Sequence, residues 1–265
     1  METFFFGQPS RRLFGALDGP GRKARTGLVF CPPFGEEMIT TYARLARWSK
    51  ELGKMGIAVL RFHPFGTGES DGTFRDYTIE GALRDTMTAM TCLRERTGVE
   101  RVGFFGLRFG AFLAAQAALA NPPDFLLLWS PVTDTRQYFR ELLRMRLTAE
   151  LVHLKADRVK VTTKSMINDF EAGLTVDNLG YEFSPALYLQ MNSGSPWPQQ
   201  PPSLKVLWLS RVSERNQLDS LPNDWVAQGG NAKLEFLPEL PFWEDFSSVF
   251  PEKFARASEG WLAAE

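Results

Sequence analysis

The sequence predicts one α/β domain, residues 1–265, in which helices cover both faces of a mostly parallel β-sheet. Short β-rich runs alternate with helical patterns along the chain, which is the order of elements that such a sheet requires. The length of 265 residues suits one large domain, and 44% hydrophobic with 23% charged residues is ordinary globular composition. A packed core is therefore expected.

The strands are predicted from the β-rich runs, taken in chain order. The chain is expected to open with an antiparallel pair, Thr3–Phe6 and Arg11–Leu17. Later strands are expected at Thr26–Cys31, Ile57–Phe62, Val102–Phe105, Phe125–Trp129, Leu204–Leu209 and Lys233–Leu237.

Helical patterns follow several of these strands. Helices are predicted at Tyr42–Met55, Thr78–Thr97, Phe109–Ala120 and Ser247–Ala264. The longest nearly uninterrupted apolar stretch, Phe109–Ala120, is too short to span a bilayer, and the first residues show no export pattern. We therefore expect no membrane insertion.

A long insertion, residues 136–203, separates the strands that end at Trp129 and begin at Leu204, and it exceeds a plain crossover. Its first half is helical and amphipathic, and it ends in a Pro-rich connector, Ser193–Ser203. From Arg136 to Lys164 eight Lys/Arg face three Asp/Glu, and the arginines at 136, 140 and 144 share a face. This basic face is either a solvated surface or a lid that favours an acidic ligand.

A strand, a tight Gly-bounded turn and a helix follow one another at VGFFG-L-R-F-G-AFLAAQAALA. In α/β hydrolases this succession holds the nucleophile elbow, G-x-S-x-G, so the α/β-hydrolase fold is expected. Gly106 and Gly110 keep the turn, but the central residue is Arg108. Because a guanidinium is permanently protonated and offers only donors, Arg108 cannot attack a carbonyl.

A literal G-x-S-x-G occurs elsewhere, at Gly68–Gly72, and would suggest Ser70 as the nucleophile. Its context is wrong, because several loop residues separate the preceding strand from the helix that begins near Thr78. We interpret Ser70 as part of a Gly-rich turn.

The other two triad positions also lack their residues. The histidine should lie in the loop after the last strand, but that loop reads LPELPFWED. The only histidines are His63, at the ligand-facing edge of the sheet, and His153, in the insertion, where a packing role is expected. Glu214 could stand at the acid position, but it would have no imidazole to orient.

Four motifs in order resemble the second class of exosortase-A-system-associated hydrolases: CPPFGEEM at 31–38, FGTGESDG at 65–72, GLRFGA at 106–111 and PFW at 241–243. The resemblance covers roughly residues 26–131 and 204–245. It implies an α/β-hydrolase-superfamily protein of bacteria, linked to exopolysaccharide production, with G-L-R-x-G at the elbow. The resemblance implies no substrate.

Two roles are open for Arg108. One role is an internal ion pair with Glu36 or Glu37 that only fills a site without catalytic function. Both glutamates lie on the loop that supplies an oxyanion-hole amide in active relatives. Alternatively, Arg108 clamps a ligand carboxylate or phosphate above a helix N-terminus. The residues expected around such a ligand are Phe34, Gly35, His63, Leu107, Arg108, Phe109 and Trp243.

Three functions follow as hypotheses. The first is a non-catalytic binder of a small acidic or acylated ligand or of a partner protein. The second is an active hydrolase or acyltransferase that uses Glu36 or Glu37 as general base and Arg108 as electrophilic stabiliser. The third is a purely structural subunit that docks through the lid helix.

The net charge and the cysteine content argue against several kinds of partner and site. A formal net charge of −1 gives no global attraction to nucleic acid, so no nucleic-acid partner is expected. Cys31 and Cys92 are too few for a disulfide framework or a metal knuckle, which favours a cytoplasmic location. We expect no metal and no cofactor.

Overall fold

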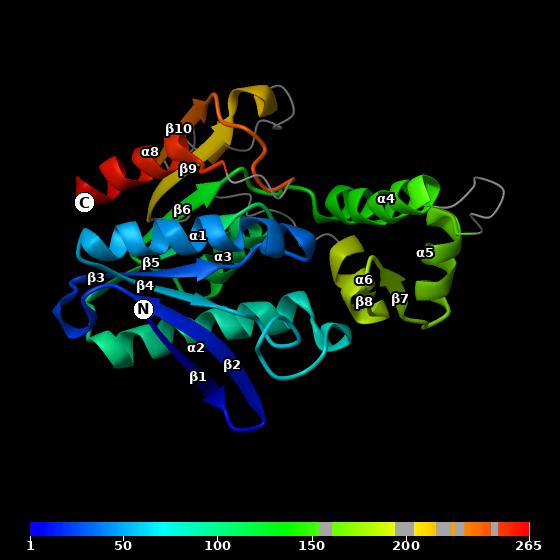
Figure 1. The fold of residues 1–265 in the computed structure, drawn as a ribbon, viewed down its shortest axis with the longest axis horizontal. Helices are drawn as coiled ribbons and strands as arrows, with labels where there is room; N and C mark the ends of the chain where they lie inside the picture. Colours follow the sequence, from blue (N-terminus) through cyan, green and yellow to red (C-terminus); the bar gives the residue numbers. More distant parts are fainter. Residues whose placement is uncertain (154–160, 194–203, 216–223, 226–230, 245–248, 265) are drawn as a thin grey trace.

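The computed structural model describes residues 1–153, 161–193, 204–215, 224–225, 231–244 and 249–264. In this part of the chain eight strands form one sheet in the order β1-β2-β4-β3-β5-β6-β9-β10 (Figure 1). The strands are β1 (Glu2–Gln8), β2 (Arg11–Asp18), β3 (Thr26–Cys31), β4 (Ile57–Phe62), β5 (Arg101–Leu107), β6 (Phe125–Trp129), β9 (Lys205–Arg211) and β10 (Ala232–Leu237). All eight predicted strands are confirmed.

The sheet is mixed, as the sequence predicts. β1 and β2 pair antiparallel, and so do β2 and β4. From β4 to β10 every neighbouring pair is parallel. The carboxyl ends of the parallel strands therefore share one edge, where ligands bind in open α/β sheets.

Helices cover both faces and divide the core in two. α2 (Ile79–Thr97) and α3 (Phe109–Ala120) pack on one face, around Phe104 and Phe112. α1 (Glu36–Lys54) and α8 (Glu252–Ala263) cover the other, around Trp48 and Trp129. Since both faces are buried, the central strands are almost wholly apolar.

Three predicted helix starts need comment. α1 begins at Glu36, six residues before the predicted start at Tyr42, because Gly35 turns the chain and the two glutamates that follow favour a helix N-terminus. α2 begins where predicted, capped by the Thr78 hydroxyl, which accepts from the Gly81 amide. α8 starts at Glu252, with Pro251 at its N-cap, so the predicted start at Ser247, which itself lies outside the described residues, was too early.

The insertion between β6 and β9 lies beyond the carboxyl edge of the sheet (Figure 1). Its elements are α4 (Thr135–His153), α5 (Thr163–Glu171), β7 (Val176–Asn178), β8 (Tyr181–Phe183) and α6 (Pro185–Asn192). The β7–β8 hairpin was not predicted. The Pro-rich connector after Ser193 and the His153 side chain lie outside the described residues.

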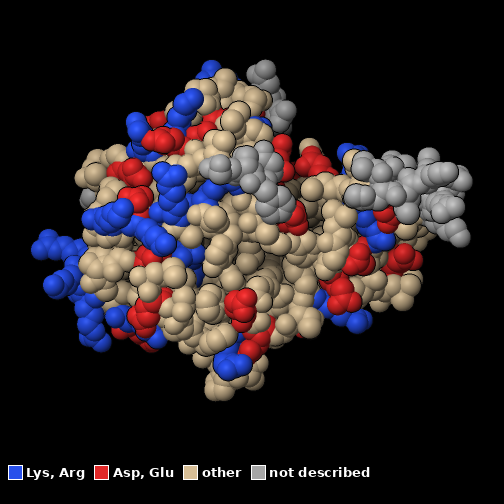
Figure 2. All heavy atoms as spheres, viewed as in Figure 1, with Lys and Arg blue, Asp and Glu red and all other residues tan. Residues whose placement is uncertain are grey.

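Charged side chains of both signs are interspersed over the face in Figure 2, in keeping with the small net charge. Among the described helices, none combines the length and the apolar character that crossing a membrane requires.

Candidate functional site

Arg108 occupies a strained elbow between β5 and α3. Its backbone has φ 55° and ψ −120°, a region that favours glycine. The turn is fixed because the Arg108 amide donates to the Trp129 carbonyl and its own carbonyl accepts from Ala111 and Val132. The expected strand–turn–helix geometry is thus present, with an arginine at its apex.

Close backbone packing explains the two elbow glycines. A Cβ on Gly106 would lie 2.2 Å from the Gly110 carbonyl oxygen, and one on Gly110 would lie 2.3 Å from that of Cys31. Neither site can hold a side chain. The glycine pattern is therefore required by the turn itself, whichever residue stands between them.

Glu37 binds the arginine directly. The Arg108 Nε lies 3.2 Å from Glu37 Oε1, and the Tyr138 hydroxyl donates to Glu37 Oε2 at 3.0 Å. The side chains of Arg108 and Glu37 are only 20% and 14% exposed. Of the two carboxylates proposed as partners, Glu37 makes the pair, whereas Glu36 accepts from the Tyr181 hydroxyl at 3.3 Å.

Burial and the neighbouring opposite charge act in opposite directions on the pKa of Glu37 and on that of Arg108. Burial raises the pKa of Glu37, and the adjacent Arg108 only partly opposes this. Burial alone would lower the pKa of Arg108, but Glu37, Tyr138 and Glu214 outweigh it, so the pKa is raised. Burial and the Glu37 charge raise the pKa of Tyr138 well above its usual range, which keeps its hydroxyl a donor.

A second ion pair stands at the position expected for the catalytic acid. Glu214, which is buried, accepts from Arg211 Nε at 2.9 Å and from the Ser130 hydroxyl at 2.8 Å. It also accepts from the Arg211 backbone amide at 3.0 Å. The carboxylate is thus held by an arginine and a hydroxyl, where a triad acid would orient an imidazole.

Trp243 links the two ion pairs. Its ring centroid lies 5.0 Å from the guanidinium carbon of Arg108 and 5.0 Å from that of Arg211, within the range of cation–π contacts. Its backbone carbonyl accepts from the Thr40 hydroxyl. Trp243 therefore lies between the elbow and the acid position, where the histidine of a triad would reach both.

These residues line a pocket of about 300 Å³. Its walls come from the elbow, the start of the insertion and the loops after β9 and β10: Arg108, Pro131, Val132, Thr133, Asp134, Gln137, Tyr138, Glu141, Arg211, Glu214, Trp243 and Glu244. Its two arginines face four carboxylates, an excess of two negative charges. The exposed arginines of α4 at 136, 140 and 144 are not among the lining residues.

Three residues expected to contact ligand lie in the core instead. Phe34, Leu107 and Phe109 are at most 2% exposed. The Phe34 ring packs on Phe109 and on Phe183 of the insertion, and the Phe109 ring stacks on Tyr138. Gly35, with φ 56°, is the turn that starts α1. Aromatic rings thus fill this side of the elbow.

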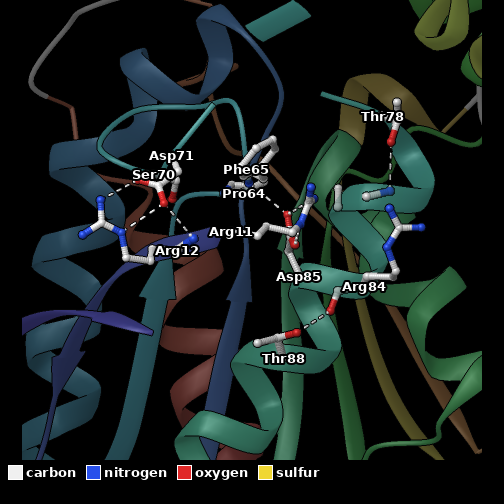
Figure 3. A network of polar contacts seen from close by, with 12 residues as sticks. Arg11, Arg12, Pro64, Phe65, Ser70, Asp71, Thr78, Arg84, Asp85 and Thr88 are labelled. Carbon is white, nitrogen blue, oxygen red and sulfur yellow. Dashed lines mark hydrogen bonds and ion pairs between the residues drawn. The ribbon is translucent and has the colours of Figure 1, made fainter. Parts of the chain in front are cut away.

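Ser70, the serine of the G-x-S-x-G sequence at Gly68–Gly72, is held in a structural turn. The Ser70 hydroxyl donates to the His63 carbonyl at 2.5 Å and accepts from the Phe14 amide at 2.9 Å. Figure 3 shows Ser70 beside Asp71, which binds Arg12 of β2. Both hydrogen-bonding functions of the Ser70 hydroxyl are therefore satisfied by backbone.

His63 lies in a different cavity from Arg108. Its Nδ1 accepts from the Glu69 amide at 3.0 Å, so the neutral ring carries its proton on Nε2. Burial, and next the charge of Arg61, lower its pKa to about 4. His63 is thus neutral at pH 7 and separate from the elbow pocket.

Sequence reasoning missed Arg211, Tyr138 and Ser130. Arg211 had a usable signal, because it lies two residues after the predicted end of a strand, at the ligand-facing edge and close to Glu214. Tyr138 had none, since its contact with Glu37 joins residues 101 positions apart. In the described part of the chain, no group of His, Cys, Asp or Glu side chains is placed to hold a metal ion.

No protein-family profile and no curated protein matches the sequence. Solved structures do. Est1E from Butyrivibrio proteoclasticus, with ferulic acid bound, matches with 16% identity and a TM-score of 0.62 over 98% of both chains. Alpha/beta hydrolase domain-containing protein 10 from mouse matches with 13% identity and a TM-score of 0.62 over 100% of this chain and 99% of its own. Proline iminopeptidase from Mycobacterium smegmatis matches with 15% identity and a TM-score of 0.60 over 100% of both chains.

Proposed function

The chain has the α/β-hydrolase fold, and we propose that it uses this fold to bind a small polar ligand in the Arg108 pocket without hydrolysing it. One observation carries the proposal. The strained elbow that would present a nucleophile presents a guanidinium, which is tied to Glu37 and lies against Trp243. A fixed cation in that place can bind and orient a ligand but cannot form an acyl-enzyme.

The arginines have donors left for a ligand. Arg108 and Arg211 each use Nε on a protein carboxylate, and no described residue provides an acceptor for their η nitrogens. Both side chains line the pocket. Acceptors on a bound ligand could therefore pair with these donors in charge-assisted hydrogen bonds. If the Arg108–Glu37 ion pair only filled a site without function, we would expect no such pocket.

The charge of the lining narrows the ligand class. The carboxylates of Asp134, Glu141, Glu214 and Glu244 outnumber the two arginines, and Glu37 adds another behind Arg108. A purely acidic ligand, as expected from the sequence, would be repelled by this excess of negative charge. The aromatic rings around Phe34 are buried and do not line the pocket, so they offer no surface to an acyl chain bound there. We therefore propose a ligand that carries an ammonium or hydroxyl donor as well as an acceptor.

The alternative of a Glu37 general base has less support. Both Glu37 oxygens are engaged, one by Arg108 and the other by Tyr138. Glu36 is bound by Tyr181. Proton abstraction by either carboxylate would first require one of these contacts to break.

We also propose a relationship to the exosortase-A-system-associated hydrolases, and with it a bacterial, cytoplasmic role linked to exopolysaccharide production. The support is the four motifs in order, together with two cysteines that are buried and free. A partner protein at the insertion remains a further proposal without a contact that favours it.

Binding is tested with Arg108→Gln and a matched control, Arg136→Gln, which removes an exposed arginine outside the pocket. Free amino acids, diamines and dicarboxylates are titrated at fixed ionic strength while the melting temperature is followed. Amino acids, which carry both an ammonium donor and a carboxylate acceptor, should stabilise the native protein and the control but not Arg108→Gln, whereas diamines, which bring no acceptor for the arginines, should show no such dependence on Arg108. Equal responses in all three proteins, or a response to dicarboxylates alone, would overturn the proposal.

A further inference from the structure

A second cavity lies between α1 and the antiparallel edge of the sheet. Its lining comes from β2, β3, β4, the loop after β3 and the first turns of α1: Phe14, Ala16, Phe30, Pro32, Pro33, Met38, Tyr42, Leu45, Arg61, Phe62 and His63. None of these residues lines the Arg108 pocket. The volume is about 40 Å³, and one water needs only ~10–15 Å³ of cavity measured in this way.

Arg61 places an unsatisfied cationic donor in this lining. The residue is 8% exposed, and its η2 nitrogen binds Asp18 Oδ2 at 3.3 Å. Its Nε is buried and has no hydrogen-bond partner among the described residues. A buried donor on a charged group is costly to leave unpaired, so an acceptor from outside the described residues is expected there.

His63 supplies a second donor on the same side of the sheet. Positions 61 and 63 are two apart at the end of β4, so their side chains share a face. Since the Nδ1 of His63 accepts from Glu69, its Nε2 carries the proton, and no described residue accepts it. The Tyr42 ring lies 5.6 Å from the Arg61 guanidinium carbon and 5.8 Å from the His63 ring.

The rest of the lining is apolar apart from Tyr42. A ligand that fits must therefore bring acceptors for two donors and an alkyl surface for the walls, within a few heavy atoms. Water brings no alkyl surface, and a carboxylate binds a guanidinium better than a neutral acceptor does. We propose that this cavity binds a short-chain monocarboxylate of about the size of acetate, held by Arg61 Nε and His63 Nε2.

Nitrogen-15 NMR of the whole protein tests this site without any substitution. Sodium acetate replaces sodium chloride at constant ionic strength while the Arg61 Nε–H and His63 imidazole signals are followed. Both signals should shift saturably with one affinity. Trimethylacetate, which has the same charge but more bulk, should leave them in place.

Two variants check the assignment. Arg61→Lys keeps the charge but removes the Nε donor, and we expect about tenfold weaker acetate binding. His63→Asn keeps an acceptor for the Glu69 amide but removes the Nε2 donor, and should also weaken binding. The proposal is overturned if acetate leaves the native Arg61 signal unchanged, or if both variants bind acetate as the native protein does. None of these results depends on the Arg108 pocket.

Discussion

Arg108 Nε lies 3.2 Å from Glu37 Oε1, so the cation at the elbow is neutralised by the first turn of α1. The pair joins two loops that converge on the carboxyl edge of the sheet. Tyr138 of the insertion completes it from a third element.

Breaking this pair should destabilise the protein in a coupled way. Arg108→Gln or Glu37→Gln leaves a mostly buried charge unpaired, and each should lower the free energy of unfolding by about 2–4 kcal/mol. The double substitution should lower the free energy of unfolding by clearly less than the two single substitutions added together, with a coupling energy of about 1–3 kcal/mol. Urea unfolding of the four proteins measures this. Strict additivity would mean that the two side chains do not interact in solution.

The strained backbone at Arg108 makes a separate prediction. Arg108→Ala and Arg108→Gly remove the same ion pair, but only glycine adopts φ 55° and ψ −120° without strain. We expect Arg108→Gly to be the more stable of the two by about 1 kcal/mol. Thermal unfolding compares them directly. If alanine proved the better residue, position 108 would not have this conformation.

Two bidentate pairs on β2 offer a matched comparison, drawn in Figure 3. Asp85 is buried and binds Arg11 and the Phe65 amide, whereas Asp71 binds Arg12 at the surface. Asp85→Asn should lower the free energy of unfolding by about 2–4 kcal/mol, because it removes a buried carboxylate that holds both the half-buried Arg11 guanidinium and the Phe65 amide. Asp71→Asn should leave the unfolding midpoint nearly unchanged. Similar losses in both variants would contradict this ranking.

His63 should make stability fall in mild acid. Its pKa is about 4 in the folded protein, against 6.5 when unperturbed. Between these values the unfolded chain binds more protons, so stability rises with pH across the window and is lost as pH falls. From pH 7 to pH 4 the native protein should lose about 3 kcal/mol more than His63→Asn. Parallel pH profiles for the two proteins would show that His63 titrates normally.

The sheet was predictable because its strands are short, apolar and separated by helical patterns. Every strand of the large sheet was anticipated, and so was the elbow at Gly106–Gly110, whose close packing leaves room only for glycine. The β7–β8 hairpin was missed because each of its strands has three residues, too few for a periodic signal.

The site was predictable only in part. The sequence placed Arg108, Glu36 or Glu37, Trp243 and Glu214 at the same edge of the sheet, since each follows a predicted strand. It could not choose between Glu36 and Glu37, because the choice depends on which side of α1 meets Tyr138. It placed Phe34 and Phe109 against ligand, but they pack on rings of the insertion, a contact that no local pattern encodes.

The proposed function requires that no hydroxyl among the described residues is activated for attack. Incubation of the native protein with a fluorophosphonate probe, followed by intact mass analysis, measures this directly, with an active serine hydrolase treated in parallel. The mass should stay unchanged, since Ser70 is bound to backbone and Ser130 to Glu214. Stoichiometric addition of one phosphonyl group to any serine would contradict the account.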